Sequence, residues 1–354
     1  MANLLVTGGA GFIGANFVHH WSACHPDDSV IVLDALTYAG NPANLSGLNS
    51  VELVEGDICD TDLVERLIAD RGINTIVHFA AESHVDRSIS GPDAFVTTNV
   101  IGTHSLLKAA KRQWLDKDRA RPHRFHHVST DEVYGSLTLE DPAFSETTPY
   151  APNSPYSASK AGSDHLVRAY HHTFGLQTTT TNCSNNYGPF QFPEKLIPLF
   201  LLNCLYGRPL PIYGDGQNRR DWLHVGDHCL GIELALLRGV AGETYNVGGG
   251  EELPNMAVID QICATVDAAF AQDPTLADRF PDAPAGRGGS SAELKTFVED
   301  RKGHDRRYAI DDRKIRADLG YVPSRDFGRG FSETLQWYLN HESWWLPLLG
   351  RKSV

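Results

Sequence analysis

The stretch Asn3-Leu4-Leu5-Val6-Thr7-Gly8-Gly9-Ala10-Gly11-Phe12-Ile13-Gly14 decides the fold of this chain. An apolar run typical of a buried β-strand leads directly into closely spaced glycines, and a helical pattern begins at residue 12. The glycines satisfy Gly-x-Gly-x-x-Gly through positions 9, 11 and 14, and Gly-x-x-Gly-x-x-Gly through 8, 11 and 14. Glycine lets the backbone turn sharply and approach a pyrophosphate, while the following helix N-terminus supplies N–H donors. We therefore predict a dinucleotide site whose first contacts are Gly8, Gly11, Phe12, Ile13 and Gly14.

An acid closes the second predicted strand. Val30-Ile31-Val32-Leu33 ends at Asp34, about 20 residues beyond the glycine loop, where a carboxylate accepts hydrogen bonds from adenosine ribose hydroxyls. No arginine follows Asp34, which favours NAD over NADP. Glu82 and Asp86, after the fourth strand, suit a site role or a solvated loop equally well. Residues at the ends of the third and fourth strands are also expected near the cofactor: Asp57, Ile58, Ala80, Ala81 and Ser83.

Short apolar runs alternate with helical patterns along most of the chain, as is typical of a parallel, doubly wound sheet. We predict an α/β fold with a Rossmann-type domain over 1–182, to which 215–250 return. A smaller, mixed C-terminal lobe, 183–214 and 251–354, would close over a ligand at the carboxyl edge of the sheet. Strands are predicted at 3–7, 30–34, 51–55, 75–79, 125–129, 177–182 and 244–247. Helices are predicted near 12–24, 61–70, 93–112, 156–174, 193–206, 226–239 and 255–270. Residues 282–290 are expected to form a mobile surface loop, and two short helices, 311–319 and 328–341, to finish the chain.

The composition of the 354 residues limits the classes of function. Hydrophobic residues make up 41% and charged residues 21%, as is ordinary for a soluble enzyme. The formal charge of −13 argues against nucleic-acid or anionic-membrane partners. The six cysteines form no CxxC pair, which favours free thiols in a reducing compartment, and we predict a cytoplasmic protein. The first residues contain neither a basic leader nor a long apolar span, which argues against a signal peptide or transmembrane helix.

Two groups of residues indicate the chemistry. Tyr156 and Lys160 stand one turn apart and share a face of a predicted helix. A nearby ammonium and a positive nicotinamide ring would lower the tyrosine pKa from about 10, so that the phenolate removes a hydroxyl proton as a hydride leaves the same carbon. Asp131 and Glu132 follow Thr130 at a predicted strand end. Oxidation does not need these two acids, but they can remove a proton from carbon and expel a hydroxyl.

Four longer motifs make this interpretation more specific. They are Asp34-Ala35-Leu36-Thr37-Tyr38-Ala39-Gly40-Asn41, Ala80-Ala81-Glu82-Ser83-His84-Val85-Asp86-Arg87-Ser88-Ile89, Ser129-Thr130-Asp131-Glu132-Val133-Tyr134-Gly135 and Asn182-Cys183-Ser184-Asn185-Asn186-Tyr187-Gly188-Pro189. With them the chain resembles the extended short-chain dehydrogenase/reductase superfamily over nearly its whole length, and within it the dTDP-glucose 4,6-dehydratases. The resemblance implies dTDP-glucose as the substrate and NAD as a recycled cofactor. It adds to the expected NAD contacts Leu36, Thr37, Thr98, Tyr156, Lys160 and Asn186.

The resemblance also implies roles for the five expected catalytic residues. Tyr156, beside Lys160, would deprotonate the C4 hydroxyl of the glucosyl unit while NAD takes the C4 hydride, and Thr130 would hydrogen-bond that oxygen. Glu132 would then remove the C5 proton as general base, and a protonated Asp131 would donate to the departing C6 hydroxyl. NADH would return its hydride to C6. The two acids need opposite protonation states, which close like charges and partial burial can provide.

The resemblance places the sugar nucleotide partly outside the cofactor domain. Arg220 would bind the diphosphate, since guanidinium groups suit bidentate phosphate contacts, and residues 210–214 would form a wall against the thymine. Lys302 stands where the family usually has proline, and 271–297 is longer and irregular; both lie near the expected substrate mouth. The implied substrate contacts are Ser83, Thr130, Asn185, Lys195, Leu196, Pro211, Tyr213, Arg220, Asn255, Arg301 and His304.

Two other functions share most of these signals. A nucleotide-sugar 4-epimerase would use the same glycine loop and Tyr156–Lys160 pair, but it would not need Asp131 and Glu132. A non-catalytic NAD-sensing regulator on the same fold is the second alternative. A metal site is not expected: the paired histidines 126–127 and 171–172 have no accompanying ligand set with zinc spacing, so packing or surface positions are favoured.

Apolar residues on the predicted helices 93–112 and 156–174 must mostly pack on the sheet. They are Phe95, Val96, Val100, Leu106, Leu107, Leu166, Val167 and Tyr170. The resemblance implies that these two helices also pair with their copies in a homodimer.

Overall fold

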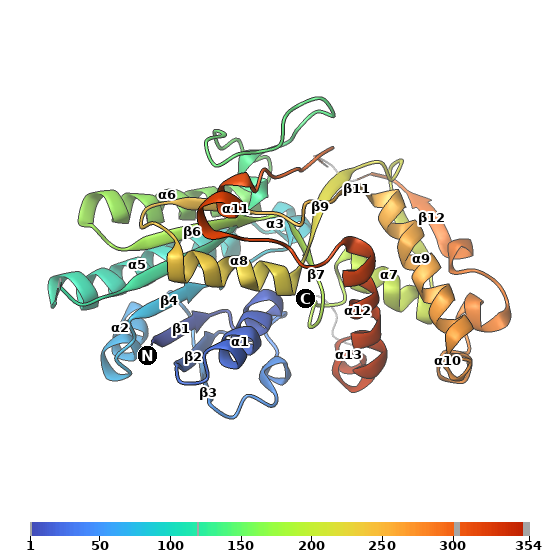
Figure 1. Ribbon diagram of the computed structural model, residues 1–354, viewed down its shortest axis with the longest axis horizontal. Coiled ribbons are helices and arrows are strands. Elements are labelled where there is room, and N and C mark those ends of the chain that lie inside the picture. The colour runs from blue at the N-terminus through green and yellow to red at the C-terminus, as the bar shows by residue number, and fades with distance from the viewer. Residues whose placement is uncertain (1, 119, 301–304, 350–354) are drawn as a thin grey trace.

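A seven-stranded parallel sheet in the order β10-β6-β5-β4-β1-β2-β3 forms the larger part of the molecule (Figure 1). The computed structural model describes residues 2–118, 120–300 and 305–349. The strand order reverses beside β1, which marks a doubly wound sheet and confirms the predicted fold class. The strands are β1 (Asn3–Thr7), β2 (Ser29–Asp34), β3 (Val51–Glu55), β4 (Thr75–His78), β5 (Arg124–Thr130), β6 (Thr178–Cys183) and β10 (Thr244–Val247).

Alternation along β1 explains why both faces of the sheet are covered. Leu4 and Val6 pack with α1 (Phe12–Cys24) and α8 (Val225–Arg238) on one face. Leu5 points the other way, into a cluster with α2 (Thr61–Asp70), α5 (Thr103–Ala110) and α6 (Pro155–Phe174). A strand buried on both faces appears as a continuous apolar run in the sequence, which is why Leu4-Leu5-Val6 was a reliable signal.

The helices of this part agree closely with the predictions. The expected 93–112 helix is a run of short helical segments: α4 (Asp93–Phe95), η2 (Val96–Gly102), α5 and η3 (Lys111–Asp116), of which η2 and η3 have π-type geometry. Before it lies α3 (Val85–Ser90). Ser154 and Ser157 form a capping box at the start of α6, Pro155 occupies its first turn, and Gly175 ends it in the left-handed conformation.

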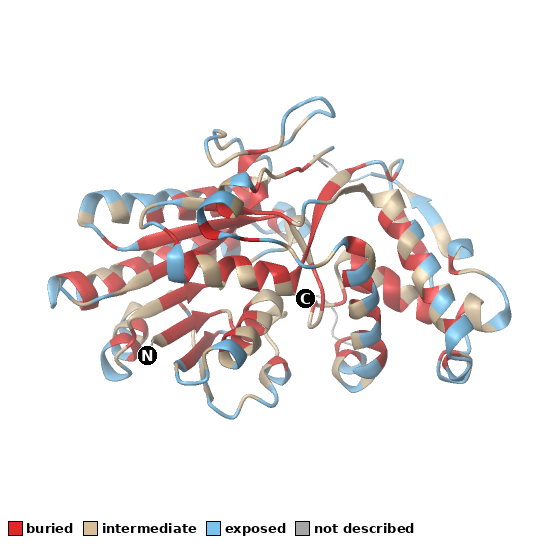
Figure 2. Ribbon diagram, viewed as in Figure 1, coloured by how far each residue is buried: buried red, intermediate tan, exposed pale blue. Residues whose placement is uncertain are grey.

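The smaller lobe has its own core and two small sheets. One sheet has the order β11-β9-β7, from β7 (Asn185–Tyr187), β9 (Arg219–His224) and β11 (Glu252–Pro254). The other pairs β8 (Leu210–Tyr213) with β12 (Lys295–Val298). Its helices are α7 (Leu196–Leu205), α9 (Asn255–Gln272), α10 (Thr275–Arg279), α12 (Phe327–Asn340) and α13 (Glu342–Leu349), whereas α11 (Arg313–Leu319) packs against α8 and β10 of the larger part. Figure 2 shows buried faces on α7, α9 and α12 turned toward one another.

Two expectations for the lobe were wrong. A third helix, α13, follows the two that were predicted to finish the chain, and it buries Trp345 among the lobe's apolar residues. The stretch 271–297 is not irregular, because it contains α10, two 3-10 turns and strand β12. The 3-10 turns, η5 (Pro284–Arg287) and η6 (Ser291–Leu294), lie in and next to the expected loop 282–290. The Asp267 carboxylate of α9 accepts hydrogen bonds from Ser290 and Ser291 and so ties this segment to the lobe.

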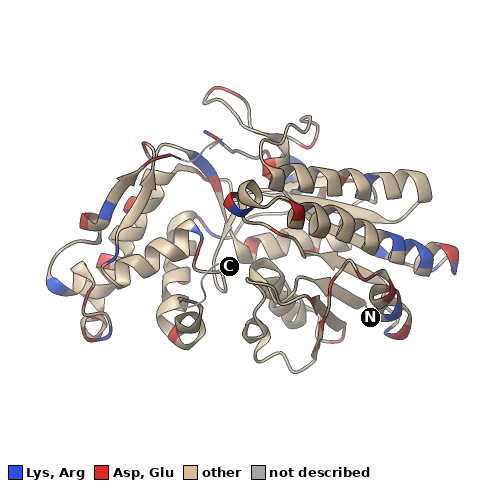
Figure 3. Cartoon of the chain, turned by 180° about the vertical axis from the view of Figure 1, so that it is seen from behind, with Lys and Arg blue, Asp and Glu red and all other residues tan. Residues whose placement is uncertain are grey.

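Charged residues are interspersed along the helices and loops in Figure 3, in keeping with a chain that is acidic overall. Within residues 2–118, 120–300 and 305–349, no helix combines the length and apolar character of a membrane span.

Candidate active site

A cavity of about 600 Å³ lies between the carboxyl ends of the parallel strands and the smaller lobe. It brings together nearly all the predicted site residues. Those that line it are Gly8, Gly11, Phe12, Ile13, Gly14, Asp34, Thr37, Asp57, Ile58, Ala80, Ala81, Ser83, Thr98, Thr130, Asp131, Glu132, Tyr156, Lys160, Asn185, Asn186, Lys195, Leu196, Pro211, Tyr213, Arg220 and Asn255. Leu36 is not part of the lining, and Arg301, Lys302 and His304 lie outside the described residues.

The glycine loop packs so closely against its own backbone and the segment after β4 that two of its positions accept only glycine. Gly8 has φ +69°, and a Cβ there would lie 2.6 Å from the Ala80 nitrogen. A Cβ on Gly14 would lie 2.3 Å from the Gly8 carbonyl oxygen. Both positions are therefore closed to other residues, and the loop runs against the end of β4 before entering α1. This arrangement fits a pyrophosphate at the α1 N-terminus.

Asp34 holds the start of the cofactor cavity in place. Its Oδ2 accepts a hydrogen bond from the Ala10 N–H (2.9 Å), and its Oδ1 accepts from the Leu36 N–H (2.9 Å). Burial raises the pKa of Asp34, and these two backbone donors act against that rise. Each carboxylate oxygen keeps a second lone pair, so Asp34 can still accept from ribose hydroxyls. Leu36 contributes by fixing this carboxylate rather than by lining the cavity.

The acid pair lies on a 3-10 turn, η4 (Asp131–Tyr134), that begins where β5 ends. Thr130 caps the turn: its Oγ1 accepts from the Glu132 N–H (3.3 Å). Asp131 is 2% exposed, and its buried Oδ2 has no hydrogen-bond partner among the residues that the structure describes. Burial first, then the charges of Glu132 and Asp221, raise the pKa of Asp131 well above its ordinary value. Glu132 is only half-buried. The turn therefore places side by side one buried acid, whose surroundings favour the protonated form, and one more accessible acid.

Tyr156 and Lys160 lie on α6, on the wall formed by its first two turns. Lys160 Nζ donates to the Val128 carbonyl oxygen (2.9 Å), which fixes the ammonium at the end of β5. The expected lowering of the tyrosine pKa is not found within the protein. Burial and then the charge of Glu132 raise the pKa of Tyr156 well above its usual range. Burial lowers the pKa of Lys160 as well, and Asp164 acts against that lowering. The expectation for Tyr156 also included the positive nicotinamide ring of bound NAD, so it stays a prediction for the cofactor-bound protein.

A buried polar network between α6 and β5 was not predicted from the sequence. The Asp164 carboxylate accepts from Ser129 Oγ (2.9 Å) and Tyr150 OH (2.9 Å), and it lies 3.0 Å from His127 Nε2. Burial raises the pKa of Asp164 to about 6, and Lys160 acts against that rise. The signal available in the sequence was an acid one turn after Lys160, on the same helix face. His127 is thus a packed histidine, as expected, and so is His126, which contacts Thr179 and Thr181.

Asn99 is a second residue that sequence reasoning missed. Its side-chain amide donates to the Glu82 carbonyl oxygen (3.0 Å) and to Ser159 Oγ (2.8 Å), and its Oδ1 accepts from the Glu82 N–H (2.9 Å). One buried amide therefore joins the end of β4 to the helix that carries Tyr156. An asparagine inside an apolar helical run was the only available signal.

Arg220 is the main cation on the lobe side of the cavity. It lies on β9 and is 7% exposed, with its guanidinium 4.3 Å from the centre of the Tyr308 ring. Its Nη1 donates to the Arg219 carbonyl (2.7 Å) and its Nη2 to the Asp305 carbonyl (2.9 Å). These bonds hold the guanidinium at the wall. Asp131 and Glu132 are among the charges that support its protonated state against burial.

A group near the cavity mouth was not predicted. The Arg87 guanidinium lies 3.6 Å from the centre of the Tyr38 ring and 3.4 Å from Glu194 Oε2. His84 Nε2 is 3.7 Å from the same carboxylate. These residues come from three segments, so only the folded chain reveals their proximity.

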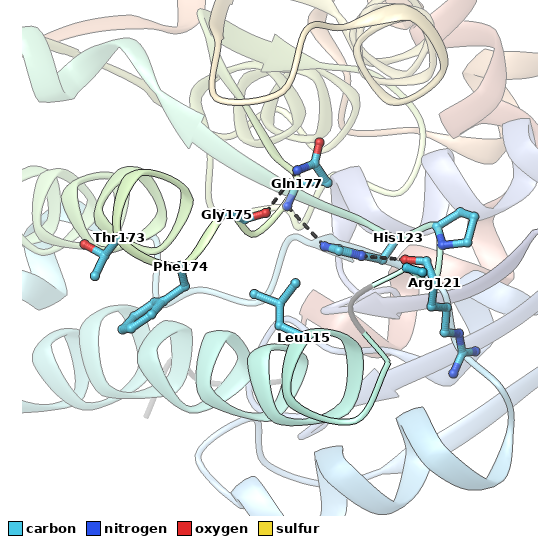
Figure 4. A pocket seen from close by; sticks show the side chains of 9 residues that line it. Leu115, Arg121, His123, Thr173, Phe174, Gly175 and Gln177 are labelled. Carbon is cyan, nitrogen blue, oxygen red and sulfur yellow. Dashed lines mark hydrogen bonds between the residues drawn. The ribbon is translucent and has the colours of Figure 1, made fainter.

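A second hollow of about 760 Å³ lies just before the starts of β5 and β6, at the amino ends of the strands. Figure 4 shows the side chains that line it. It is lined by residues 115, 120–123, 173–175 and 177. Its imidazole, His123, already contacts the Arg121 carbonyl (2.9 Å) and the Gln177 N–H (3.2 Å). It holds none of the predicted site residues.

The fold and the site together define a dinucleotide-dependent enzyme of the extended short-chain dehydrogenase/reductase class. The GDP-mannose 4,6 dehydratase family model matches residues 5–334. A dTDP-glucose 4,6-dehydratase from Xanthomonas campestris pv. campestris (strain B100) is 53% identical over 349 residues, covering 97% of this chain and 95% of the relative. The chain belongs to the dTDP-glucose 4,6-dehydratase family.

Solved structures agree. The crystal structure of the dTDP-glucose 4,6-dehydratase DesIV from Streptomyces venezuelae, with NAD and TYD bound, matches with a TM-score of 0.84 and 48% identity, covering 98% of this chain and 99% of that one. The UDP-glucose 4-epimerase of Thermotoga maritima has a TM-score of 0.81 but only 26% identity, over 96% of this chain and 99% of that one. The fold is thus common to both activities, and the sequence relationship separates them.

Proposed function

We propose that this chain converts dTDP-glucose into dTDP-4-keto-6-deoxyglucose and water, with NAD as a recycled cofactor. One observation carries the proposal: the acids Asp131 and Glu132 stand directly after Thr130, in the same cavity as Tyr156. A 4-epimerase needs only the redox groups and has no use for this pair.

NAD fits the residues of the cofactor half. Gly8, Gly11 and Gly14 of the glycine loop line the cavity, and Asp34 stands at the end of β2. The same cavity continues to Tyr156 and Lys160. When bound, NAD accepts a hydride from C4 of the glucosyl unit and later returns it to C6.

Tyr156 and Thr130 act on the C4 oxygen. Tyr156 takes the hydroxyl proton and Thr130 donates a hydrogen bond to the same oxygen. Because burial and Glu132 keep the pKa of Tyr156 high, the nearby charge of Lys160 is needed to make proton removal possible at neutral pH. Asp164, one turn after Lys160 on α6, supports the charged form of Lys160.

The acid pair then eliminates water. A ketone at C4 acidifies the C5 hydrogen, which Glu132 removes as general base. Asp131, held protonated by burial and by its neighbour, donates its proton to the C6 hydroxyl, which leaves as water. Glu132 returns its proton to C5 as C6 receives the hydride. The proton gained by Tyr156 replaces the one lost from Asp131, so the protons balance.

The lobe binds the nucleotide in this proposal. Arg220 is the diphosphate contact, since its guanidinium is fixed at the cavity wall. Pro211 and Tyr213 on β8 face the same cavity and suit the base, and Lys195 lies where α7 begins. The division into a cofactor domain (1–182 with 215–250) and a nucleotide-sugar lobe (183–214 with 251–354) remains our proposal, as do the contacts of Arg301 and His304.

We further propose a homodimer formed through the helical run 93–116 and α6. Val96 and Ile101 on this run are 51% and 52% exposed, and Ile89 on neighbouring α3 is 54% exposed. Exposed aliphatic side chains gathered on adjacent helices favour an interface. Ile101→Glu should shift the protein to monomers in analytical ultracentrifugation, whereas Leu237→Glu, at an equally exposed leucine on α8, should not.

A cytoplasmic location is supported by six cysteines that are all free thiols.

Incubation of the purified protein with dTDP-glucose tests the proposed reaction. Dehydration yields a 4-keto-6-deoxy sugar nucleotide, detectable by mass spectrometry as loss of water. Formation of dTDP-galactose would instead support an epimerase. Unchanged substrate, with NAD bound, would support a regulator and contradict the proposal.

A further inference from the structure

A group of metal-binding side chains lies at the far end of α1, away from the active site. His20 and Cys24 are four residues apart on α1, so they share a face of the helix. Glu233, on the neighbouring helix α8, points into the same group. A ligand atom from each of the three residues lies within 4.8 Å of the other two. We propose that His20, Cys24 and Glu233 form a binding site for a zinc ion, which links α1 to α8.

The donor atoms match the chemistry of zinc. Zn²⁺ takes imidazole nitrogen, thiolate sulfur and carboxylate oxygen at about 2.0–2.3 Å, in tetrahedral geometry. Donors around such an ion are roughly 3.5 Å apart. His20 Nε2 and Glu233 Oε2, now 2.6 Å apart, would separate slightly to admit the ion, and all three ligand atoms already lie within 4.8 Å of one another. Three protein ligands leave a fourth position for solvent. Hard cations such as Mg²⁺ prefer all-oxygen sites and do not suit this set.

His25 supplies the outer partner that such sites commonly have. Glu233 Oε2 lies 2.6 Å from His20 Nε2, and Glu233 Oε1 lies 2.7 Å from His25 Nε2. The carboxylate is therefore held from both sides, and one of its oxygens can bind an ion while His25 orients the other. The Glu233 side chain is 14% exposed and the two imidazoles about a quarter exposed, so the group is accessible to an ion yet partly shielded from water.

The charges favour a cation at this place. Among the described residues, the ion pairs of Glu233 are with histidines only, and no lysine or arginine neutralises it. Glu233 and a Cys24 thiolate together would balance the two charges of the ion. The protein as a whole is acidic, with a formal charge of −13.

The position indicates a structural rather than a catalytic role. α1 begins at the glycine loop and has 13 residues, so its C-terminal end lies about 20 Å from the cofactor cavity. His20 and Glu233 are 213 residues apart in sequence, and both helices pack on one face of the sheet. An ion between them would join the first and last parts of the Rossmann-type domain and stabilise the folded state by mass action.

Cobalt(II) and zinc titrations test the site on the full-length, tag-free protein after treatment with chelator. We expect one Co²⁺ per chain, with the sulfur-to-cobalt charge-transfer band and the strong visible bands of tetrahedral coordination. Zn²⁺ should displace Co²⁺, and at 100 times its Kd it should raise Tm by roughly 4 °C.

Variants decide whether the named residues bind the ion. Cys24→Ser should abolish the charge-transfer band and the zinc-induced rise in Tm, and Glu233→Gln should also abolish that rise. His25→Gln should weaken zinc about 10–100-fold. Cys59→Ser, at another partly accessible cysteine, should behave like the wild type. Absence of the sulfur-to-cobalt band in the wild type, or an equal rise of Tm in Cys24→Ser, would overturn the proposal.

Discussion

The two catalytic walls of the cavity are built very differently. Tyr156 and Lys160 stand on a capped helix of 20 residues, anchored through Ser159 to Asn99 and through Lys160 to β5. Asp131 and Glu132 stand on a turn of four residues. In our proposal the helix wall provides redox groups that an epimerase would also use, whereas the turn provides two acids that line the cavity, of which Asp131 is nearly buried and Glu132 is more accessible. If the proposed roles hold, the step that distinguishes a dehydratase from an epimerase, loss of water, depends on the shorter and more local of the two structures.

Removal of the helix wall's phenol should have the largest effect, because it blocks the first step. Tyr156→Phe should lower kcat by about 10³–10⁴-fold, at the upper end of what general acid–base groups contribute. Neither reduced cofactor nor dehydrated product should accumulate in a single-turnover experiment. Bound NAD, measured after denaturation, serves as the control and should be unchanged. Turnover near the wild-type rate would remove Tyr156 from the proposed role.

Replacing Glu132, the more accessible acid of the turn, by a neutral residue should leave the helix wall intact. Glu132→Gln should reduce product formation by about 10²–10³-fold, because the C5 proton loses its base. The fraction of chains that hold NAD should stay the same. Product analysis by mass spectrometry measures the effect. Wild-type turnover in this variant would refute the assignment of Glu132 as the C5 base.

Asp164 tests how the helix wall is positioned. Asp164→Asn removes the charge that supports protonated Lys160, while an amide can still accept from Ser129 and Tyr150. We expect kcat to fall about tenfold with KM unchanged, and the pH profile of kcat to shift. A merely structural role would lower Tm without moving the pH profile, and that outcome would remove Asp164 from the positioning of Lys160.

The smallest effect concerns stability. The folded-state pKa of Asp131 is raised, so the folded protein binds a proton that the unfolded chain releases above pH 4 or so. Wild-type stability from this group is present below the unfolded pKa and is lost as pH rises through the folded pKa. Asp131→Asn lacks this loss. The free energy of unfolding of Asp131→Asn relative to wild type should therefore grow with pH across that window, by up to about 1.4 kcal/mol per pH unit, and then level off. Thermal denaturation at a series of pH values measures this as a growing difference in Tm. A Tm difference that is independent of pH between 4 and 8 would contradict a protonated Asp131.

The Rossmann-type part of the fold was readable from sequence, since its strands are buried on both faces and its helices have clear ends. β1 and α1 begin and end where they were predicted. The sheet of β7, β9 and β11 was not predicted. Asn185-Asn186-Tyr187 and Arg219-Arg220-Asp221 have neither an apolar run nor alternation, and only pairing with distant strands makes them β-structure.

The site divides in the same way. The residues expected along the cavity follow strand ends or a helix start, where topology brings them to one edge. The contacts of Asp164 and Asn99, and the Tyr38–Arg87–Glu194 group, join segments far apart in the chain. No local pattern encodes such contacts. The raised pKa of Tyr156 in the protein alone has a related cause, because burial and the charge of Glu132 depend on the folded surroundings.

One experiment tests the central claim, that the turn carries the elimination while the helix carries the oxidation. Asp131→Asn is mixed with dTDP-glucose in a stopped-flow instrument, and NADH absorbance is followed through one turnover. Because C4 oxidation remains possible while the C6 hydroxyl lacks its acid, we predict that NADH accumulates to a large fraction of the sites and decays slowly. Wild-type protein should show little NADH. If the variant forms no NADH, or forms product at the wild-type rate, then the acid of the elimination is not Asp131.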